Sequence, residues 1–197
     1  AKTQDIRPLR IAILNLMPDK ITTETQILRK IGNTIVQIDI TLLAIENHIS
    51  KNTSQTHLDT FYRYFSDVKK EYFDGIIITG APITATIYKS SFNIEHLSFQ
   101  DVSYWNELKE IFDWTKTNVF ASLFICWGSQ AAMKHFYGIE KSAFDKKLFG
   151  VFPHIKECEN DPLFLGMDDV FYVPHSRNTE SIPEEIRTNL NLEVLAS

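Results

Sequence analysis

The sequence has little cysteine and no long apolar run. Its two cysteines, Cys126 and Cys158, are too few for a disulfide framework, and no C-x-x-C metal spacing occurs. We therefore expect reduced thiols, as in the cytosol, and no metal. The longest apolar runs are the length of strands, which predicts no membrane span. The first ten residues lack the apolar core of a signal peptide. The sequence thus predicts a cytoplasmic protein with no membrane partner.

Basic residues are also in short supply. Lys and Arg together number 20 against 25 Asp and Glu, for a formal charge of -5, which argues against a nucleic-acid partner. The hydrophobic fraction of 44% is ordinary for a globular protein, and 197 residues suffice for one domain with a sizeable core. The chain begins at Ala1 rather than Met and ends in an apolar, strand-like run. We expect a single domain, 1–197, that lacks its C-terminal part.

Apolar runs of strand length alternate with patterns typical of helices. Continuous apolar strands separated by helices favour an α/β fold with a mainly parallel sheet and helices on both faces. A capping box at Thr23–Gln26 predicts the start of the first helix. The predicted strands are 10–17, 34–45, 74–82 and 119–126, followed by 148–155, 168–176 and 192–197; the predicted helices are 23–31, 57–73 (as one helix or a pair), 102–117 and 128–137.

One residue stands where such a fold places its chemistry. Cys126 comes at the end of a predicted strand and just before a predicted helix, at the sheet edge where ligands bind in open α/β folds. The helix N-terminus would stabilise a thiolate, and the Trp127 amide could stabilise an oxyanion. The other reading is a small buried side chain that does no chemistry, and the local pattern leaves both open. By position, His175 is the best candidate for a base within this chain.

Several longer strings, taken together, are more specific than this turn. In chain order they closely resemble homoserine O-acyltransferases (O-acetyltransferases and O-succinyltransferases) of the glutamine-amidotransferase-like type. The resemblance implies a class I glutamine-amidotransferase-like architecture, a flavodoxin-like three-layer fold. The strings are "LNLMPDKITTETQILRKIGNT", "HISKNTSQTHLDTFY", "FDGIIITGAP", "LFICWGSQAAMKHFYGI", "KKLFGVF" and "PHSRNTE".

The resemblance also implies an activity. Such enzymes transfer an acyl group from acetyl-CoA or succinyl-CoA to the hydroxyl of homoserine, in methionine biosynthesis. Some relatives acylate serine instead, which would place this chain in cysteine biosynthesis. The resemblance implies acyl-CoA as a co-substrate with no permanently bound cofactor, and a homodimer.

The family's functional positions can be placed on this sequence. Cys126 matches the nucleophile that accepts the acyl group, and Lys147 and Ser176 match residues that line the substrate site. Glu95 matches the position where glutamate accompanies acetyl-CoA, since its charge would repel a succinyl carboxylate. Its backbone amide, with that of Trp127, would form the oxyanion hole. Beside Ser176, Arg177 could bind a carboxylate through two hydrogen bonds.

The chain departs from the family in two ways. The family's base is a histidine in an H-P-E string that lies beyond the last predicted strand, and this chain stops before it. An insertion, Thr84–Asn93, lies in the loop that should carry the oxyanion donor. Two other functions therefore stay open: a cysteine hydrolase or amidotransferase-like enzyme on the same fold, and a non-catalytic remnant.

Overall fold

The computed structural model describes residues 5–46, 53–81, 85–87, 90–92, 97–158 and 161–197. The chain divides into two compact units, Ala1–Ala132 and Met133–Ser197. Each unit is described by itself, and one helix, α5 (Trp127–Tyr137), runs from the first into the second. The expectation of a single domain stays a prediction.

The first unit is built around a parallel sheet of five strands in the order β3-β2-β1-β4-β7. Every neighbouring pair in it is parallel, so the carboxyl ends of the strands meet at one edge. This confirms the predicted α/β class. The elements are β1 (Leu9–Leu14), α1 (Lys20–Ile31), β2 (Ile38–Ala44), α2 (Gln55–Phe61), β3 (Tyr62–Tyr64), α3 (Phe65–Val68), β4 (Phe73–Ile78), β5 (Ala85–Ile87), β6 (Ser90–Phe92), the 3-10 turn Phe99–Asp101, α4 (Trp105–Asn118) and β7 (Val119–Phe124).

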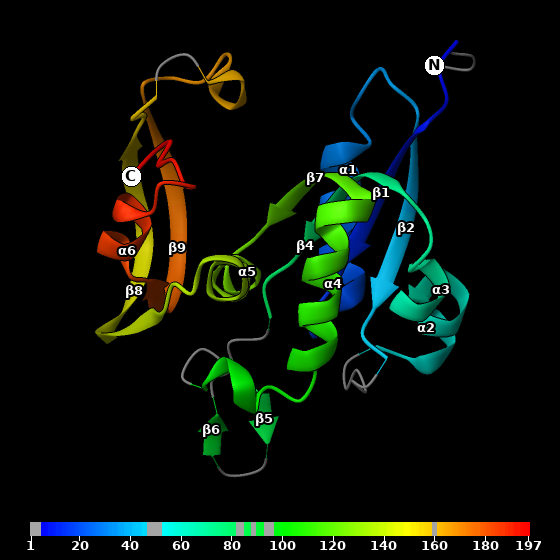
Figure 1. Cartoon of the computed structure of the whole chain (residues 1–197), viewed down its shortest axis with the longest axis horizontal. Coiled ribbons are helices and arrows are strands. Elements are labelled where there is room, and N and C mark those ends of the chain that lie inside the picture. The colour runs from blue at the N-terminus through cyan, green and yellow to red at the C-terminus, as the bar shows by residue number, and fades with distance from the viewer. Residues whose placement is uncertain (1–4, 47–52, 82–84, 88–89, 93–96, 159–160) are drawn as a thin grey trace. The chain divides into compact units, whose positions relative to one another are not determined.

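The core lies between this sheet and its helices. The inner strand β1 has Ala12, Ile13 and Leu14 fully buried, as expected for a strand covered on both sides. In Figure 1, α4 lies over one face of the sheet. Its buried side chains recur every three to four residues, at Leu108, Ile111, Phe112 and Trp114 among others, which confirms the amphipathic helix that the sequence predicted.

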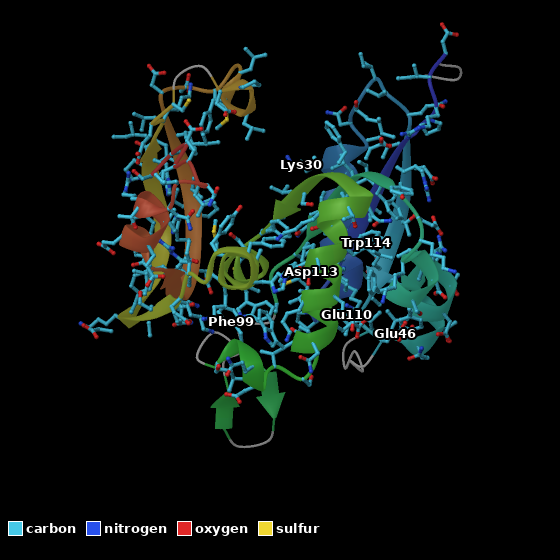
Figure 2. All side chains as sticks on the ribbon, viewed as in Figure 1. Lys30, Glu46, Phe99, Glu110, Asp113 and Trp114 are labelled. Atoms are coloured by element: carbon cyan, nitrogen blue, oxygen red, sulfur yellow. The ribbon has the colours of Figure 1, made fainter. Side chains whose placement is uncertain are left out.

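Trp114 shows how α4 is fixed to the rest of this unit. The indole, labelled in Figure 2, makes edge contacts with Phe65 and Phe73, with ring centroids 5.6 and 5.8 Å apart. Its Nε1 donates a hydrogen bond of 3.0 Å to the carbonyl of Lys69. A buried tryptophan usually needs such an acceptor, and here the acceptor lies next to α3.

The first helix begins earlier than predicted. The sequence placed its N-terminus at the hydroxyl of Thr23, but α1 starts at Lys20 with Asp19 as the N-cap. The Asp19 carboxylate accepts hydrogen bonds from the Thr22 amide and hydroxyl, at 3.1 and 2.8 Å. A carboxylate is at least as good an N-cap as a hydroxyl, and it is also favoured by the helix dipole.

The second unit is a long β-hairpin with a short helix. Its strands, β8 (Lys141–Ile155) and β9 (Val170–Ser181), pair antiparallel (Figure 1). The 3-10 turn Pro162–Phe164 lies in their connection, and α6 (Pro183–Thr188) follows β9. The strand predicted at 192–197 is wrong. That segment makes one isolated bridge, between Lys156 and Ala196, flanked by backbone hydrogen bonds of Ser197 with Ile155 and of Leu195 with Glu157, and this pairing is too short to count as a strand.

Candidate nucleophile and substrate-binding residues

Cys126 occupies the turn between β7 and α5, where the sequence predicted it. Its φ of 56° is the only positive φ of a non-glycine residue among the described positions. An L-residue adopts this left-handed conformation at a cost of about 1–2 kcal/mol, and such strain is concentrated at functional sites. The side chain is exposed, and neither cysteine of the described chain forms a disulfide. The alternative of a buried Cys126 is therefore wrong in this structure, and its role as a nucleophile stays a prediction.

The helix that follows directs its N-terminus toward this turn. The Cys126 carbonyl accepts hydrogen bonds from the amides of Ser129 and Gln130, at 3.0 and 3.2 Å, so Cys126 stands at the cap position of α5. Helix N-termini favour negative charge because their first amides and the helix dipole are directed outward. We therefore expect these amides to stabilise a thiolate at this position.

Two glycines let the end of β4 approach the start of α5 closely. A Cβ on Gly128 would lie 2.6 Å from the carbonyl oxygen of Thr79, and one on Gly80 would lie 3.1 Å from the Cys126 Cβ and 3.5 Å from its sulfur. The Thr79 hydroxyl accepts a 2.8 Å hydrogen bond from the Leu16 amide, which ties this turn to the end of β1. Sequence reasoning noted Gly128 but missed Gly80, although a glycine just after an apolar strand is the expected signal.

Trp127 contributes both a backbone amide and a buried ring. Only 1% of the residue is exposed, and its ring contacts Phe99 (labelled in Figure 2) and Tyr104 at centroid distances of 5.8 and 6.2 Å. Its indole Nε1 has no hydrogen-bond acceptor among the described residues. The tight packing of the ring fixes the first turn of α5 directly after Cys126.

The second predicted oxyanion donor cannot be placed. Glu95 lies outside the described residues. Part of the insertion Thr84–Asn93 is described, namely the strands β5 and β6, which pair antiparallel with Ala85 opposite Phe92. The described part of the insertion is thus a pair of short antiparallel strands.

A buried polar cluster at the carboxyl edge of the same sheet was not predicted. Lys20 is 5% exposed, and its Nζ donates to the carbonyl of Asn15. The Asn15 amide donates to the Tyr62 hydroxyl at 3.0 Å, and that hydroxyl donates to Glu24 at 2.7 Å. His57 Nε2 lies 2.8 Å from the other Glu24 oxygen. These five side chains form one connected cluster.

The cluster borders a small cavity of about 80 Å³. Lys20, Asn15 and Tyr104 are among its lining residues. Burial lowers the pKa of Lys20 to about 8, although nearby Glu24 opposes the shift. A buried lysine with such a pKa at this edge is a candidate functional group. Its only signal in the sequence is a lysine shortly after the end of a buried strand.

In the second unit, Lys147 and Ser176 lie on the same face of the hairpin. Ser176 pairs with Phe149, and Lys147 precedes Phe149 by two positions, with its Nζ 5.6 Å from the centre of the Phe149 ring. Both Lys147 and Ser176 are exposed. The register shifts between Ala143 and Leu148, so Lys147 lies in a β-bulge, a device that redirects side chains.

Arg177 is not brought together with these two residues. Because neighbouring residues on a strand point to opposite faces, its side chain lies on the other side of the hairpin. There its guanidinium lies 5.3 Å from the centre of the Phe144 ring and 3.6 Å from the Glu180 carboxylate. Its role in binding substrate stays a prediction.

His175 lies inside β9 rather than after it, because β9 continues to Ser181. Its Nε2 is 2.9 Å from the Nε2 of His154, so the nitrogen that a base would use already has a partner. In the described part of the chain, no three His, Cys, Asp or Glu side chains come together as a metal site would require. None of its helices is long and apolar enough to cross a bilayer.

The model of the family "Homoserine O-succinyltransferase" matches residues 1–197, the whole chain. The chain belongs to this family.

Several curated relatives of this homoserine O-succinyltransferase family member are about half identical to it. Proteins named homoserine O-acetyltransferase from Clostridium botulinum (strain Eklund 17B / Type B) and Petrotoga mobilis are 50% and 52% identical over 196 residues, and they match 100% of this chain. One of the same name from Acetivibrio thermocellus is 52% identical over 98% of it. The chain spans 60% of the length of each of these relatives.

The fold also has a solved counterpart. A GMP synthase component from Thermoplasma acidophilum superimposes with a TM-score of 0.59, over 98% of this chain and 74% of its own. At 17% identity this likeness concerns the fold alone. It agrees with the glutamine-amidotransferase-like architecture that the sequence strings implied.

Proposed function

We propose that this family member transfers an acyl group from acyl-CoA to the hydroxyl of homoserine through an acyl-Cys126 intermediate, as a cytoplasmic enzyme of methionine biosynthesis. The observation that carries the proposal is the strained, exposed Cys126 at the N-terminus of α5, in a chain that belongs to an acyltransferase family. Strain at an exposed residue has no packing benefit to offset it, which supports a chemical role.

The first half-reaction uses groups that the described chain supplies. The Cys126 thiolate attacks the thioester carbonyl, and a carbon–sulfur bond forms as the carbonyl oxygen takes negative charge. The Trp127 amide, at the start of α5, would donate to that oxyanion. When the intermediate collapses, the bond to the CoA sulfur breaks and CoA leaves as its thiolate. Since one thioester replaces another, the step is close to balanced in energy.

The second half-reaction needs a base. The homoserine hydroxyl attacks the acyl-Cys126 carbonyl, its proton passes to the base, and the Cys126 thiolate is released as the ester forms. By resemblance the base is the histidine of an H-P-E string beyond residue 197. Lys20, with its pKa of about 8, is the candidate in the first unit.

The acyl donor is proposed to be acetyl-CoA. The family model carries the name of a succinyltransferase, whereas the relatives at 50–52% identity are named acetyltransferases. Glu95, through its negative charge, is the proposed reason for excluding a succinyl group. Lys147 and Ser176, which share an exposed face of the hairpin, are proposed to bind the amino-acid acceptor. We further propose a homodimer with small-molecule substrates only and no resident cofactor.

The intermediate can be detected directly. The full-length protein is mixed with acetyl-CoA alone, and intact mass spectrometry followed by peptide mapping should find one acetyl group on Cys126. Cys126→Ala should form no adduct, whereas the matched control Cys158→Ala should form it as the wild type does. Absence of the adduct in the wild type would reject the covalent scheme.

Assays with each combination of donor and acceptor then distinguish the proposed acyltransferase from the alternative functions. Steady-state rates are measured with acetyl-CoA and succinyl-CoA, each with homoserine and with serine. Turnover should be fastest with acetyl-CoA and homoserine. Release of acetate without ester formation would instead support a cysteine hydrolase, and no turnover with any pair would support a non-catalytic protein. Ser176→Ala should raise the KM for the acceptor about tenfold with little change in kcat, because it removes one hydrogen bond to bound substrate.

A further inference from the structure

Two histidines meet head to head on the hairpin of the second unit. His154 on β8 and His175 on β9 have their Nε2 atoms 2.9 Å apart and their ring centroids 5.0 Å apart. A neutral imidazole offers one donor and one acceptor nitrogen, so this contact requires a single proton between the two Nε2 atoms. The bond survives one added proton, on the Nδ1 of the ring that donates from Nε2, because the accepting ring already carries its proton on Nδ1. It is lost when both Nε2 atoms carry protons.

Aromatic rings hold this histidine pair in place. The ring of Phe152 contacts His175 edge-on at 5.4 Å, and the ring of Phe171 stacks on His154 at 5.9 Å. Both histidines are partly buried. Water therefore competes poorly for the two nitrogens, which strengthens the bond between them.

The charged groups around the pair disfavour a second proton. Arg177 and Lys156 share its face of the hairpin, and each also has an acidic partner, Glu180 at 3.6 Å and Asp169 at 3.6 Å respectively. The pKa of His175 is lowered by burial first, then by the charges of Arg177 and His154. The charges at the neighbouring α6 are Arg187, which is paired with Glu157 at 2.7 Å, together with Glu184 and Glu185.

The antiparallel ladder of β8 and β9 sets the register here, and the backbone next to His175 has two special features. Pro174, next to His175, has no N–H and cannot donate a hydrogen bond to β8. Gly150, opposite His175, has a φ of 153° that few side chains tolerate. The next residue along β9 is Ser176, whose side chain lies on the opposite face. His154, which pairs with Phe171, reaches diagonally along this face to His175, so their bond adds a side-chain contact to the ladder at the residue before Ser176.

We propose that His154 is a positioning residue: by sharing one proton with His175 it fixes the segment of β9 that presents Ser176 to the acceptor amino acid. This inference rests on the proposed function, because it assigns Ser176 to the acceptor. It adds that acceptor binding weakens in acid, when the pair takes its second proton. Acylation of Cys126 by acyl-CoA does not involve the pair.

The test separates the two half-reactions of the full-length protein. Acetyl-Cys126 formation is followed by mass spectrometry, and the KM for homoserine and kcat are measured from pH 5 to pH 8. In the wild type the acceptor KM should be flat near neutral pH and rise in acid, below the ordinary range of a histidine pKa. His135→Gln, on α5, is the matched control and should keep this profile.

Two variants at His154 should behave differently. His154→Phe keeps the stacked ring but not the bond, and should raise the acceptor KM about fivefold to tenfold at every pH. His154→Gln can donate to a neutral His175 or accept from a charged one, so it should keep the neutral KM and lose the acid rise. In both variants the acylation of Cys126 should proceed at the wild-type rate.

An unchanged KM in His154→Phe, or a retained acid rise in His154→Gln, would overturn the positioning role. A wild type that forms no acetyl-Cys126 would instead overturn the proposed function. If His154→Phe does not fold, NMR titration of the wild-type imidazoles replaces it: two coupled steps are expected, and two independent titrations would refute the shared proton.

Discussion

The left-handed backbone at Cys126 leads to a prediction about stability that needs no assumption about catalysis. Cys126→Ala keeps a Cβ at a φ of 56°, whereas Cys126→Gly removes it. Relief of the left-handed conformation is worth about 1–2 kcal/mol. Glycine lowers the free energy of unfolding by about 0.5–1 kcal/mol relative to alanine, because its unfolded chain has greater conformational freedom. The Gly variant should therefore be as stable as the Ala variant or more stable, by up to about 1.5 kcal/mol.

A matched pair in the same helix isolates the strain. Ser129 is helical, in the first turn of α5, so Ser129→Gly should be less stable than Ser129→Ala by about 1 kcal/mol. The unfolded-state entropy of glycine is common to both pairs. Subtracting the Gly–Ala difference at residue 129 from that at residue 126 thus leaves the strain itself, about 1–2 kcal/mol.

Urea denaturation followed by circular dichroism measures these four variants, with the m-value checked for constancy. The same energies correspond to shifts in Tm of about 2–4 °C per kcal/mol for a protein of this size. Both residue 126 variants should form no acetyl adduct, so Cys126→Gly should be at least as stable as Cys126→Ala while both lose activity. If glycine is as costly at residue 126 as at residue 129, Cys126 is not strained and the reasoning fails.

Two other changes test the surroundings of this turn. Gly128→Ala places a Cβ 2.6 Å from a backbone oxygen that cannot move aside, so it should cost about 1–3 kcal/mol in urea denaturation and slow acylation of Cys126. Gly138→Ala, at a φ of 74° but in open space, should cost only its strain, and equal losses would contradict the close approach. For Lys20, a folded pKa of about 8 against an unfolded 10.5 means that the unfolded chain binds more protons between these values. The burial penalty is therefore complete below pH 8 and fades as the pH rises. Between pH 7 and pH 10, the free energy of unfolding of the wild type should thus rise by about 2 kcal/mol relative to that of Lys20→Met. A difference that does not change with pH would show that Lys20 is not buried as a charged group.

Much of the first unit was predictable because its signals are local. The continuous apolar run of β1 and the spacing of Leu108, Ile111 and Phe112 each reflect burial of one short segment, and both predictions are confirmed. The start of α1 was missed because two caps lie within five residues, and the choice between Asp19 and Thr23 depends on the path of the chain before the helix. The last apolar run is not a strand because it pairs only briefly, with residues 155–157, and the run itself does not specify how far a pairing extends.

The sequence by itself determined the family, the alternation of strands and helices, and Cys126 at the end of a strand before a helix. Only the tertiary structure decided that Lys20 is buried among Asn15, Glu24 and Tyr62, and that Lys147 and Ser176 share a face of the hairpin while Arg177 does not. The physical reason is the distance along the sequence over which each interaction acts. Propensity, periodicity and turn chemistry act over a few neighbouring residues, whereas strand register brings together residues that are distant in the sequence. His154 and His175, 21 positions apart, meet only because β8 and β9 pair in one register.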